Sequence, residues 1–205
     1  MSDQIIHLLS PSIDWVGQII LVITAVIAGV IYYRPNIQHR RALFFTRLAI
    51  FGVLFRLVFA TVKTGLQYWG WSQSEFTKFL LPPHQSITVL LHYAWTHFWL
   101  NAFVSIGSAL LFFFILKTLA ARNPRYFEAG EVELGALMAL LAGWPQAVVF
   151  VPAVFFSVVI VSIVRGFWMR EAYTTLGLPF LIGYITSLVL TMYIITLFDL
   201  TALLI

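Results

Sequence analysis

Apolar runs long enough to cross a lipid bilayer follow one another along almost the whole chain. A helix needs about 20 apolar residues to cross the hydrocarbon core of a bilayer, which is about 30 Å thick. By that length the chain divides into about six spans, near residues 16–33, 44–62, 86–116, 131–144, 147–164 and 178–205. Only 10% of the residues are charged, whereas soluble domains carry about 25% because their surface faces water. We therefore predict an all-α polytopic membrane bundle that forms a single domain over residues 1–205.

The fourth predicted span is the shortest, and residues 143–146, Gly-Trp-Pro-Gln, predict a turn at its end. Small residues recur along this span at Gly135, Ala139 and Ala142. Such residues let neighbouring helices approach closely, so we expect tight packing around the span. The longest segment between spans, residues 63–85, contains Tyr and Trp residues that favour the headgroup zone. We expect it to lie on the membrane surface.

Lysine and arginine alternate strongly between the two sides of the predicted bundle. Nine of the twelve basic residues lie near the ends of spans one, three and five: Arg34, Arg40, Arg41, Arg47, Lys117, Arg122, Arg125, Arg165 and Arg170. The alternate breaks contain only Lys63 and Lys78. Because cytoplasmic loops are enriched in basic residues, this bias predicts that both termini lie outside and that the break before the fourth span lies inside.

The composition also excludes several classes of function. The net charge of +4 comes from residues that flank spans, and no basic tract with interleaved aromatics predicts a nucleic-acid partner. The chain has no cysteine, which excludes disulfides, iron–sulfur clusters and thiolate zinc sites. We therefore expect no metal site and no cofactor as the leading interpretation.

The break before the fourth span contains three of the chain's eight carboxylates, Glu128, Glu131 and Glu133. It reads Phe-Glu-Ala-Gly-Glu-Val-Glu-Leu over residues 127–134. Carboxylates near a helix N-terminus are favoured by the helix dipole without any further role. Arg122 and Arg125 lie close in sequence and are candidates to pair with them. A contact to a divalent ion or a substrate is the alternative, although such sites usually use more oxygen ligands.

Residues 130–134, Gly-Glu-Val-Glu-Leu, resemble the Gly-Asp-Val-Lys-Leu-type string of the membrane peptidases that process type IV prepilins and archaeal preflagellins. A small-residue helix and Gly143-Trp144 follow, and residues 176–181, Leu-Gly-Leu-Pro-Phe-Leu, are similar to the family's entry to its last helix. The resemblance covers about residues 100–195. It implies a polytopic protein of a prokaryotic cytoplasmic membrane, with an aspartyl-type active site on the cytoplasmic side.

The departures from this family concern its catalytic residues. The resemblance implies that Glu131 replaces one catalytic Asp and that Glu128 replaces the first Gly of the motif. The other catalytic Asp belongs at the inner end of span one, where this chain reads Tyr32-Tyr33-Arg34. Aspartyl proteolysis needs two carboxylates that share a proton. The sequence therefore indicates a degenerate relative, while activity through Glu131 with an unrecognised partner remains the alternative.

Span three carries a polar stripe formed by His97, Asn101, Ser105 and Ser108, at spacings of four, four and three. Polar residues within a bilayer usually face the bundle interior and hydrogen-bond between helices. The alternative is that His97, or His92 on the same span, binds a haem or pigment. The two histidines are five residues apart, so they do not chelate one ion from one helix face.

Arg56 is the one basic residue well inside a predicted span. Intramembrane charges are costly and usually have a partner. Asp199 in the last span is expected at a similar depth, so we predict that the two pair, directly or through water. The alternative is that Arg56 extends its side chain to the outer headgroups.

The sequence as a whole predicts a non-catalytic integral membrane subunit that is a scaffold or binding partner in a larger complex. Its expected partners are the lipid bilayer and other membrane protein subunits. An active prepilin-like peptidase and a haem- or pigment-binding subunit are the alternatives.

Overall fold

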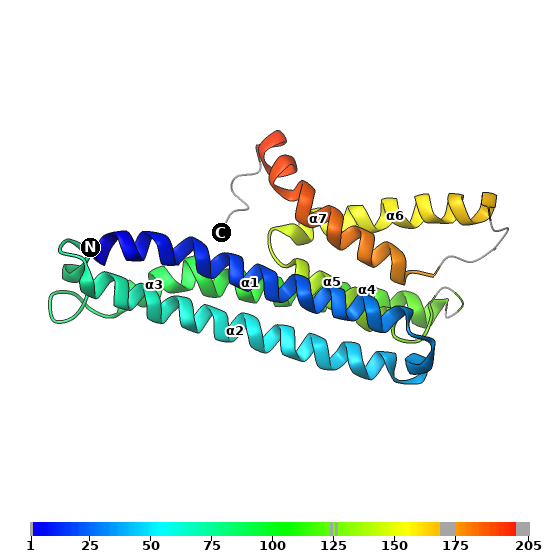
Figure 1. The fold of residues 1–205 in the computed structure, drawn as a ribbon, viewed down its shortest axis with the longest axis horizontal. Helices are drawn as coiled ribbons and strands as arrows, with labels where there is room; N and C mark the ends of the chain where they lie inside the picture. The colour runs from blue at the N-terminus through cyan, green and yellow to red at the C-terminus, as the bar shows by residue number, and fades with distance from the viewer. Residues whose placement is uncertain (1, 124, 126, 169–174, 200–205) are drawn as a thin grey trace.

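The computed structural model describes residues 2–123, 125, 127–168 and 175–199, and the chain is helical almost throughout (Figure 1). The helices are α1 (Ser2–Tyr33), α2 (Arg41–Gln73), α3 (Thr88–Ala94), α4 (Leu100–Arg122), α5 (Glu131–Ala142), α6 (Gln146–Trp168) and α7 (Gly177–Leu197). A π-helical turn, Trp95–Trp99, joins α3 to α4, and short 3-10 helices occupy Pro35–Arg40 and Thr77–Leu80. No strand occurs among the described residues, so the predicted all-α class is confirmed.

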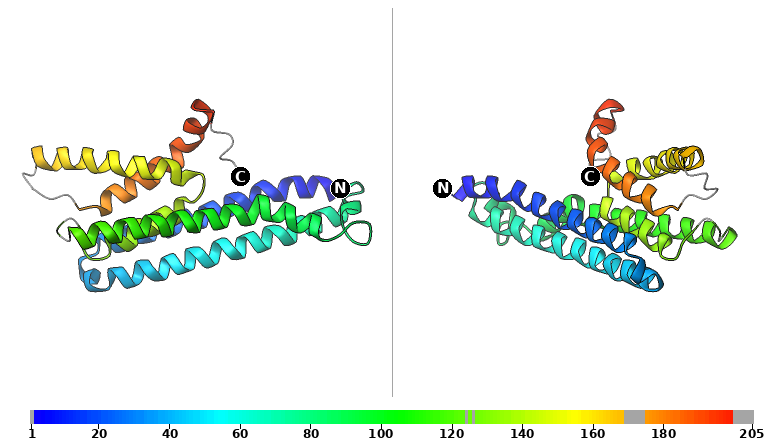
Figure 2. Two further views of the ribbon diagram at one scale, coloured as in Figure 1. Left: turned by 180° about the vertical axis from the view of Figure 1, so that it is seen from behind. Right: turned by 45° about the vertical axis from the view of Figure 1, so that its right-hand side comes forward.

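The long helices α1, α2 and α3–α4 lie side by side in one elongated layer, and α6 and α7 form a pair on one side of this layer (Figures 1 and 2). Helix α5 lies between the layer and the pair, and it contacts α1, α2, α4, α6 and α7. We call the end of the bundle near Tyr32 and Gly177 the Glu131 end. The opposite end, near Asp14 and Lys63, is called the Lys63 end.

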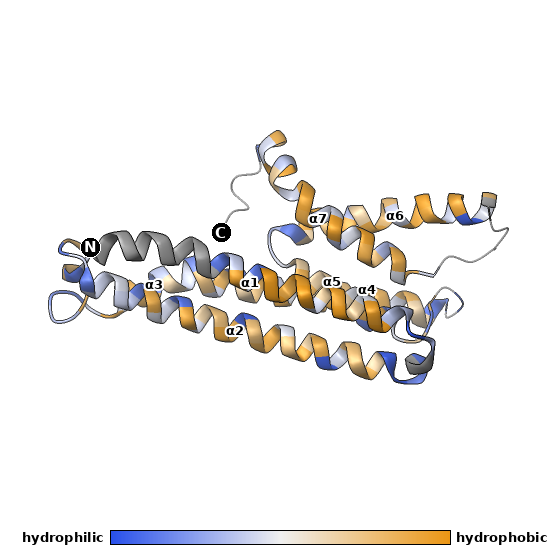
Figure 3. Cartoon of the chain, in the orientation of Figure 1, coloured by the Kyte–Doolittle hydropathy of each residue, from blue (hydrophilic) through white to orange (hydrophobic). Residues whose placement is uncertain are grey.

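Five helical segments are long and apolar enough to cross a membrane: Asp14–Tyr33, Gln38–Gln73, Thr88–Arg122, Gln146–Phe167 and Gly177–Leu197. Hydrophobic residues dominate the middle of the bundle, and the loops at its ends carry many of the hydrophilic ones (Figure 3). These segments match five of the predicted spans in place. The end of the last predicted span, residues 200–205, lies outside the described residues.

Helix α5, the fourth predicted span, is too short to cross a bilayer. Its 12 residues extend about 18 Å at 1.5 Å per residue, whereas the hydrocarbon core is about 30 Å thick. The helix ends at Gly143, whose φ of +69° favours glycine, and the chain then turns directly into α6. Helices α5 and α6 therefore form a hairpin whose turn lies within the bundle rather than beyond it.

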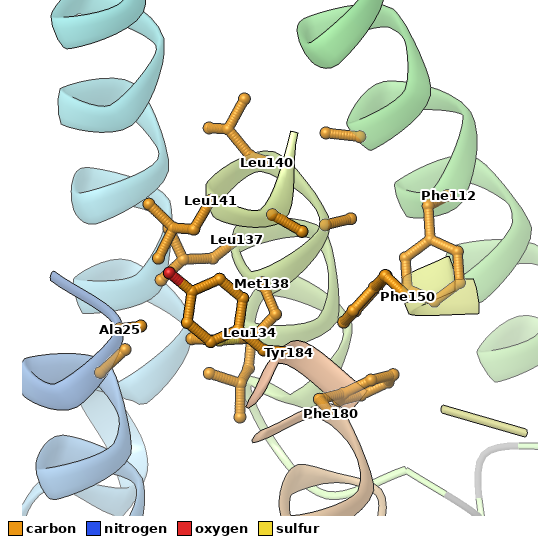
Figure 4. Close-up of a cluster of buried hydrophobic side chains, with 14 of the residues drawn as sticks. Ala25, Phe112, Leu134, Leu137, Met138, Leu140, Leu141, Phe150, Phe180 and Tyr184 are labelled. Atoms are coloured by element: carbon orange, nitrogen blue, oxygen red, sulfur yellow. The ribbon is translucent and has the colours of Figure 1, made fainter. Parts of the chain in front are cut away.

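Helix α5 is also the centre of the core (Figure 4). Its apolar residues point in all directions, as expected for a helix that is enclosed on every side. Leu134, Leu137 and Met138 are fully buried, and Gly135 lies against Leu116 and Phe180. A Cβ atom on Gly135 would come within 2.5 Å of the Leu116 side chain. The small residues of this span thus allow the close packing that the sequence predicts.

Helix α2 extends further than the sequence predicts. Its 33 residues cover about 50 Å, which exceeds the thickness of the hydrocarbon core. The aromatic residues at 68–71 therefore lie on the last turns of α2, and the segment between the helices begins after Gln73 rather than at residue 63. The side chain of Trp71 packs on Tyr93, with ring centroids 5.3 Å apart. This contact with α3 holds the extended part of α2 against the next helix.

Candidate functional site

The acidic break places one carboxylate, that of Glu131, at the junction of three segments. Gly130, with a φ of +91°, precedes the first turn of α5, and Glu131 begins the helix. Its side chain is fully buried. Oε1 accepts hydrogen bonds from the Tyr32 hydroxyl and from the Gly177 N–H, each at 2.8 Å, and Oε2 accepts one from the Glu128 N–H at 2.9 Å. Glu131 therefore ties α1 and α7 to the start of α5.

Two glycines allow the backbone to approach this carboxylate. A Cβ atom on Gly177 would lie 2.0 Å from the Tyr32 ring, so a side chain there would displace the phenol from Glu131. A Cβ atom on Gly130 would lie 2.9 Å from the Cβ of Arg41, in a backbone conformation that L-residues rarely adopt. The sequence reveals the glycines, but their role depends on the helices that converge here.

The other glutamates of the break do not join this cluster of bonds through their carboxylates. Glu128 is exposed, and its Oε2 lies 3.6 Å from the Arg41 guanidinium, which also lies over the Tyr32 ring. Arg41 thus takes the place that Arg122 or Arg125 was expected to fill, because it begins α2 directly beside the break. Glu133 is half-buried, and no hydrogen bond or ion pair involves its side chain among the described residues.

This arrangement does not form a carboxylate pair. The backbone N–H of Glu128, rather than its carboxylate, contacts Glu131, and the one side chain that donates to Glu131 is the phenol of Tyr32. The inner end of α1, where the resemblance to prepilin peptidases expects the other catalytic Asp, carries Tyr32, Tyr33 and Arg34 and no carboxylate. A phenol that donates a single hydrogen bond does not share a proton as two carboxylates do. The Glu131 carboxylate has all three of its donors from the protein itself.

Replacing Tyr32 with Phe should lower the free energy of unfolding by about 1–2 kcal/mol, because Glu131 would lose one of its donors while the ring remains in place. Unfolding of the purified protein in mixed detergent micelles measures this difference. Tyr33→Phe is the matched control, since Tyr33 is exposed, and it should have almost no effect. Equal stability of the two variants would contradict a structural role for the Tyr32 hydroxyl.

Arg56 occupies the opposite end of α5. Its Nε donates to the Leu140 carbonyl at 3.1 Å, and its Nη2 donates to the Leu140 and Leu141 carbonyls at 2.8 and 3.2 Å. These carbonyls belong to the last turn of the helix, where they have no intrahelical donor. The predicted ion pair with Asp199 is not formed, because the guanidinium is used by α5 and Asp199 lies exposed after the end of α7.

Ser105, in the polar stripe of α4, holds the turn after α5 in place. The buried Ser105 hydroxyl accepts a hydrogen bond from the Trp144 N–H at 2.8 Å and donates one to the Asn101 carbonyl at 2.7 Å. Ser108 donates to the Ser105 carbonyl at 3.0 Å. The stripe therefore connects α4 to the turn between α5 and α6.

A cavity of about 630 Å³ lies beyond the C-terminal end of α5. Arg56, Asn101 and Tyr184 line it, together with side chains from α1, α2, α4 and α7. At the Lys63 end the cavity is bordered by an ion pair between Lys63 and Asp14. The Tyr184 hydroxyl is buried and has no hydrogen-bond partner among the residues that the structure describes. Sequence reasoning missed Tyr184, because a single tyrosine in an apolar helix predicts only a core residue.

The two histidines of span three lie on exposed positions. The His97 ring stacks on Tyr93, with centroids 4.1 Å apart, and its Nδ1 lies 3.0 Å from the Tyr93 carbonyl oxygen. His97 also borders the cavity. Within the described part of the chain, no group of three or more metal-binding side chains is found. Neither His97 nor His92 therefore belongs to such a group among these residues.

The five long apolar helices around the shorter α5 define the chain as a multi-span helical membrane protein. No protein-family model, no curated protein and no solved structure matches the chain. The candidate sites are the buried Glu131 cluster and the cavity beside Arg56.

Proposed function

We propose that this protein is a non-catalytic integral membrane subunit that is a scaffold or binding partner in a larger membrane assembly. The observation that supports this most directly is the state of Glu131, the residue best placed for catalysis by sequence. Its carboxylate is fully buried and accepts three hydrogen bonds from Tyr32, Gly177 and Glu128. A general base must reach a proton of the substrate, and no such approach to Glu131 is open.

The same hydrogen bonds explain why an acid persists at this position. They join the start of α5 to α1 and α7, which gives Glu131 a structural role that needs no substrate. In this proposal the chain is a degenerate relative of the prepilin peptidases. The inner end of α1 then reads Tyr32-Tyr33-Arg34 in place of one catalytic Asp, and Glu131 retains the position of the other without its chemistry.

The surface of the bundle suits a membrane subunit. Large apolar side chains are exposed along the outer sides of α6 and α7, including Phe156 and Phe167 on α6 and Tyr193 on α7. Lipid chains or the helices of other subunits would cover such surfaces in a bilayer. By the distribution of basic residues, the proposal places the Glu131 end inside and both termini outside. The resemblance to the prepilin peptidases implies that the membrane is a prokaryotic cytoplasmic one.

Mild detergent extraction from native membranes tests this function. We expect the protein to migrate with other membrane subunits in a complex well above its own mass of 23.3 kDa. In parallel, the purified protein is incubated with prepilin-like substrates, and we expect no cleavage. Cleavage that is abolished by Glu131→Gln would overturn the proposal and establish the peptidase alternative.

A further inference from the structure

The cavity at the Lys63 end arises from the length of α5. The helix covers about 18 Å of a hydrocarbon core about 30 Å thick, so the surrounding helices continue past its last turn. The resulting space has a volume of about 630 Å³ and is bounded by residues of α1, α2, α4 and α7. Leu21, Phe55 and Leu188 form apolar parts of its wall.

The charges that line this cavity do not balance. Lys63 and Asp14 pair with each other at its border, which leaves the guanidinium of Arg56 as the remaining charge among the lining residues, with His97 counted as neutral. The carbonyls at the end of α5 offset only part of this charge, since a helix C-terminus is equivalent to about −0.5 of an elementary charge. In a region of low dielectric constant, an unbalanced cation favours binding of an anion.

Two hydrogen-bond donors that line the cavity, on Tyr184 and Arg56, have no acceptor among the described residues. The Tyr184 side chain is 3% exposed, and its hydroxyl has no hydrogen-bond partner in the described ranges of the chain. In Figure 4 this hydroxyl points away from α7. Arg56 uses Nε and Nη2 for α5, and no hydrogen bond within the described part of the chain uses its Nη1. Buried polar groups are almost always hydrogen-bonded in folded proteins, so the unpaired phenol points to a bound acceptor.

We propose that this cavity binds a phosphate-type oxyanion, with Arg56 Nη1 and the Tyr184 hydroxyl as its donors. The anion is either the phosphodiester headgroup of a membrane lipid or free phosphate. The Nη1 group of a charged guanidinium still carries two N–H donors, and hydrogen bonds from a charged donor to phosphate oxygens are strong. The apolar wall formed by Leu21, Phe55 and Leu188 would contact the glycerol and acyl carbons of a lipid. This inference does not depend on the proposed role as a subunit.

Titration of the full-length protein in detergent micelles tests the site. The probes are a short-chain phosphatidylglycerol, a diacylglycerol with the same acyl chains and inorganic phosphate. We expect phosphatidylglycerol to bind and diacylglycerol not to bind. Tyr184→Phe should weaken binding of phosphatidylglycerol about tenfold, because a hydrogen bond to a charged acceptor is lost. Tyr193→Phe is the matched control, since Tyr193 lies on the exposed side of the same helix, and it should bind as the wild type does.

The outcomes separate the two sources of the anion. Binding of inorganic phosphate with the same dependence on Tyr184 supports the site and identifies a soluble anion as its ligand. Binding of phosphatidylglycerol alone supports a lipid ligand. Equal affinity for phosphatidylglycerol and diacylglycerol, equal binding by the wild type and Tyr184→Phe, or no binding of any probe would overturn the proposal. Tyr184→Phe should fold normally, because the hydroxyl has no hydrogen-bond partner among the described residues, and its melting temperature without ligand checks this.

Discussion

Replacing Glu131 with alanine should lower the free energy of unfolding by about 4 kcal/mol, which is a large fraction of the stability of a typical protein. The substitution leaves three buried donors without an acceptor: the Tyr32 hydroxyl and the N–H groups of Gly177 and Glu128. Each unsatisfied buried donor costs about 1–3 kcal/mol. Unfolding in mixed micelles, followed by tryptophan fluorescence, measures the loss.

A conservative variant distinguishes the hydrogen bonds from the charge. In Glu131→Gln, the amide NH₂ must face at least one group that itself donates, so we expect an intermediate loss of about 2 kcal/mol. Glu133→Ala is the matched control on the same helix turn, and it should change stability by less than about 0.5 kcal/mol. If Glu131→Ala is as stable as Glu133→Ala, the carboxylate does not hold α1 and α7 to α5.

Replacing Gly143 with alanine should lower the free energy of unfolding by about 3 kcal/mol. Its φ of +69° lies in the left-handed region, where an L-residue costs about 1–2 kcal/mol. In addition, the new Cβ would lie 2.0 Å from Nη2 of Arg56. The guanidinium would have to leave the Leu140 and Leu141 carbonyls, which have no other donor at the end of α5. Thermal unfolding of the purified variant measures the combined effect.

The control for this change is Gly166→Ala in α6. Apart from the adjoining backbone of α6, no described atom lies within 4 Å of a Cβ placed on Gly166, and alanine favours a helix by about 1 kcal/mol over glycine. This variant should therefore be as stable as the wild type or more stable. A Gly143→Ala protein with the melting temperature of Gly166→Ala would show that the close approach of Arg56 to the turn is not needed.

These two predictions concern the two ends of one helix. Helix α5 does not reach across a bilayer, and a membrane interior offers no water to the free N–H and carbonyl groups at helix ends. Glu131, the first residue of α5, accepts hydrogen bonds from Tyr32, from the first N–H of α7 and from the N–H of Glu128, and Arg56 donates to the carbonyls at the end of α5. The half-length helix is thus held at both ends by side-chain hydrogen bonds, with its apolar middle enclosed by the other helices.

The sequence alone determined the class of the protein and the places of its helices, because both depend on local composition. Apolar runs of about 20 residues predict spans wherever they occur, and the five long spans in the structure lie where these runs predict them. The shortness of α5 and the turn after it are also visible locally, in the break at residues 127–134 and in Gly143. The length of α2 was underestimated, because its aromatic residues at 68–71 are compatible with both a surface segment and a helix.

Only the tertiary structure decided which side chains meet. Tyr32 and Gly177 are 99 and 46 residues from Glu131 in the chain, yet both donate to its carboxylate. Arg56 was expected to pair with an acid, and it binds carbonyls instead because α5 ends beside it. Such contacts depend on how helices pack against one another, and membrane helices of similar composition give no local signal of their neighbours. The acidic break marks where α5 begins in the sequence, whereas the fold shows that its central glutamate joins three segments.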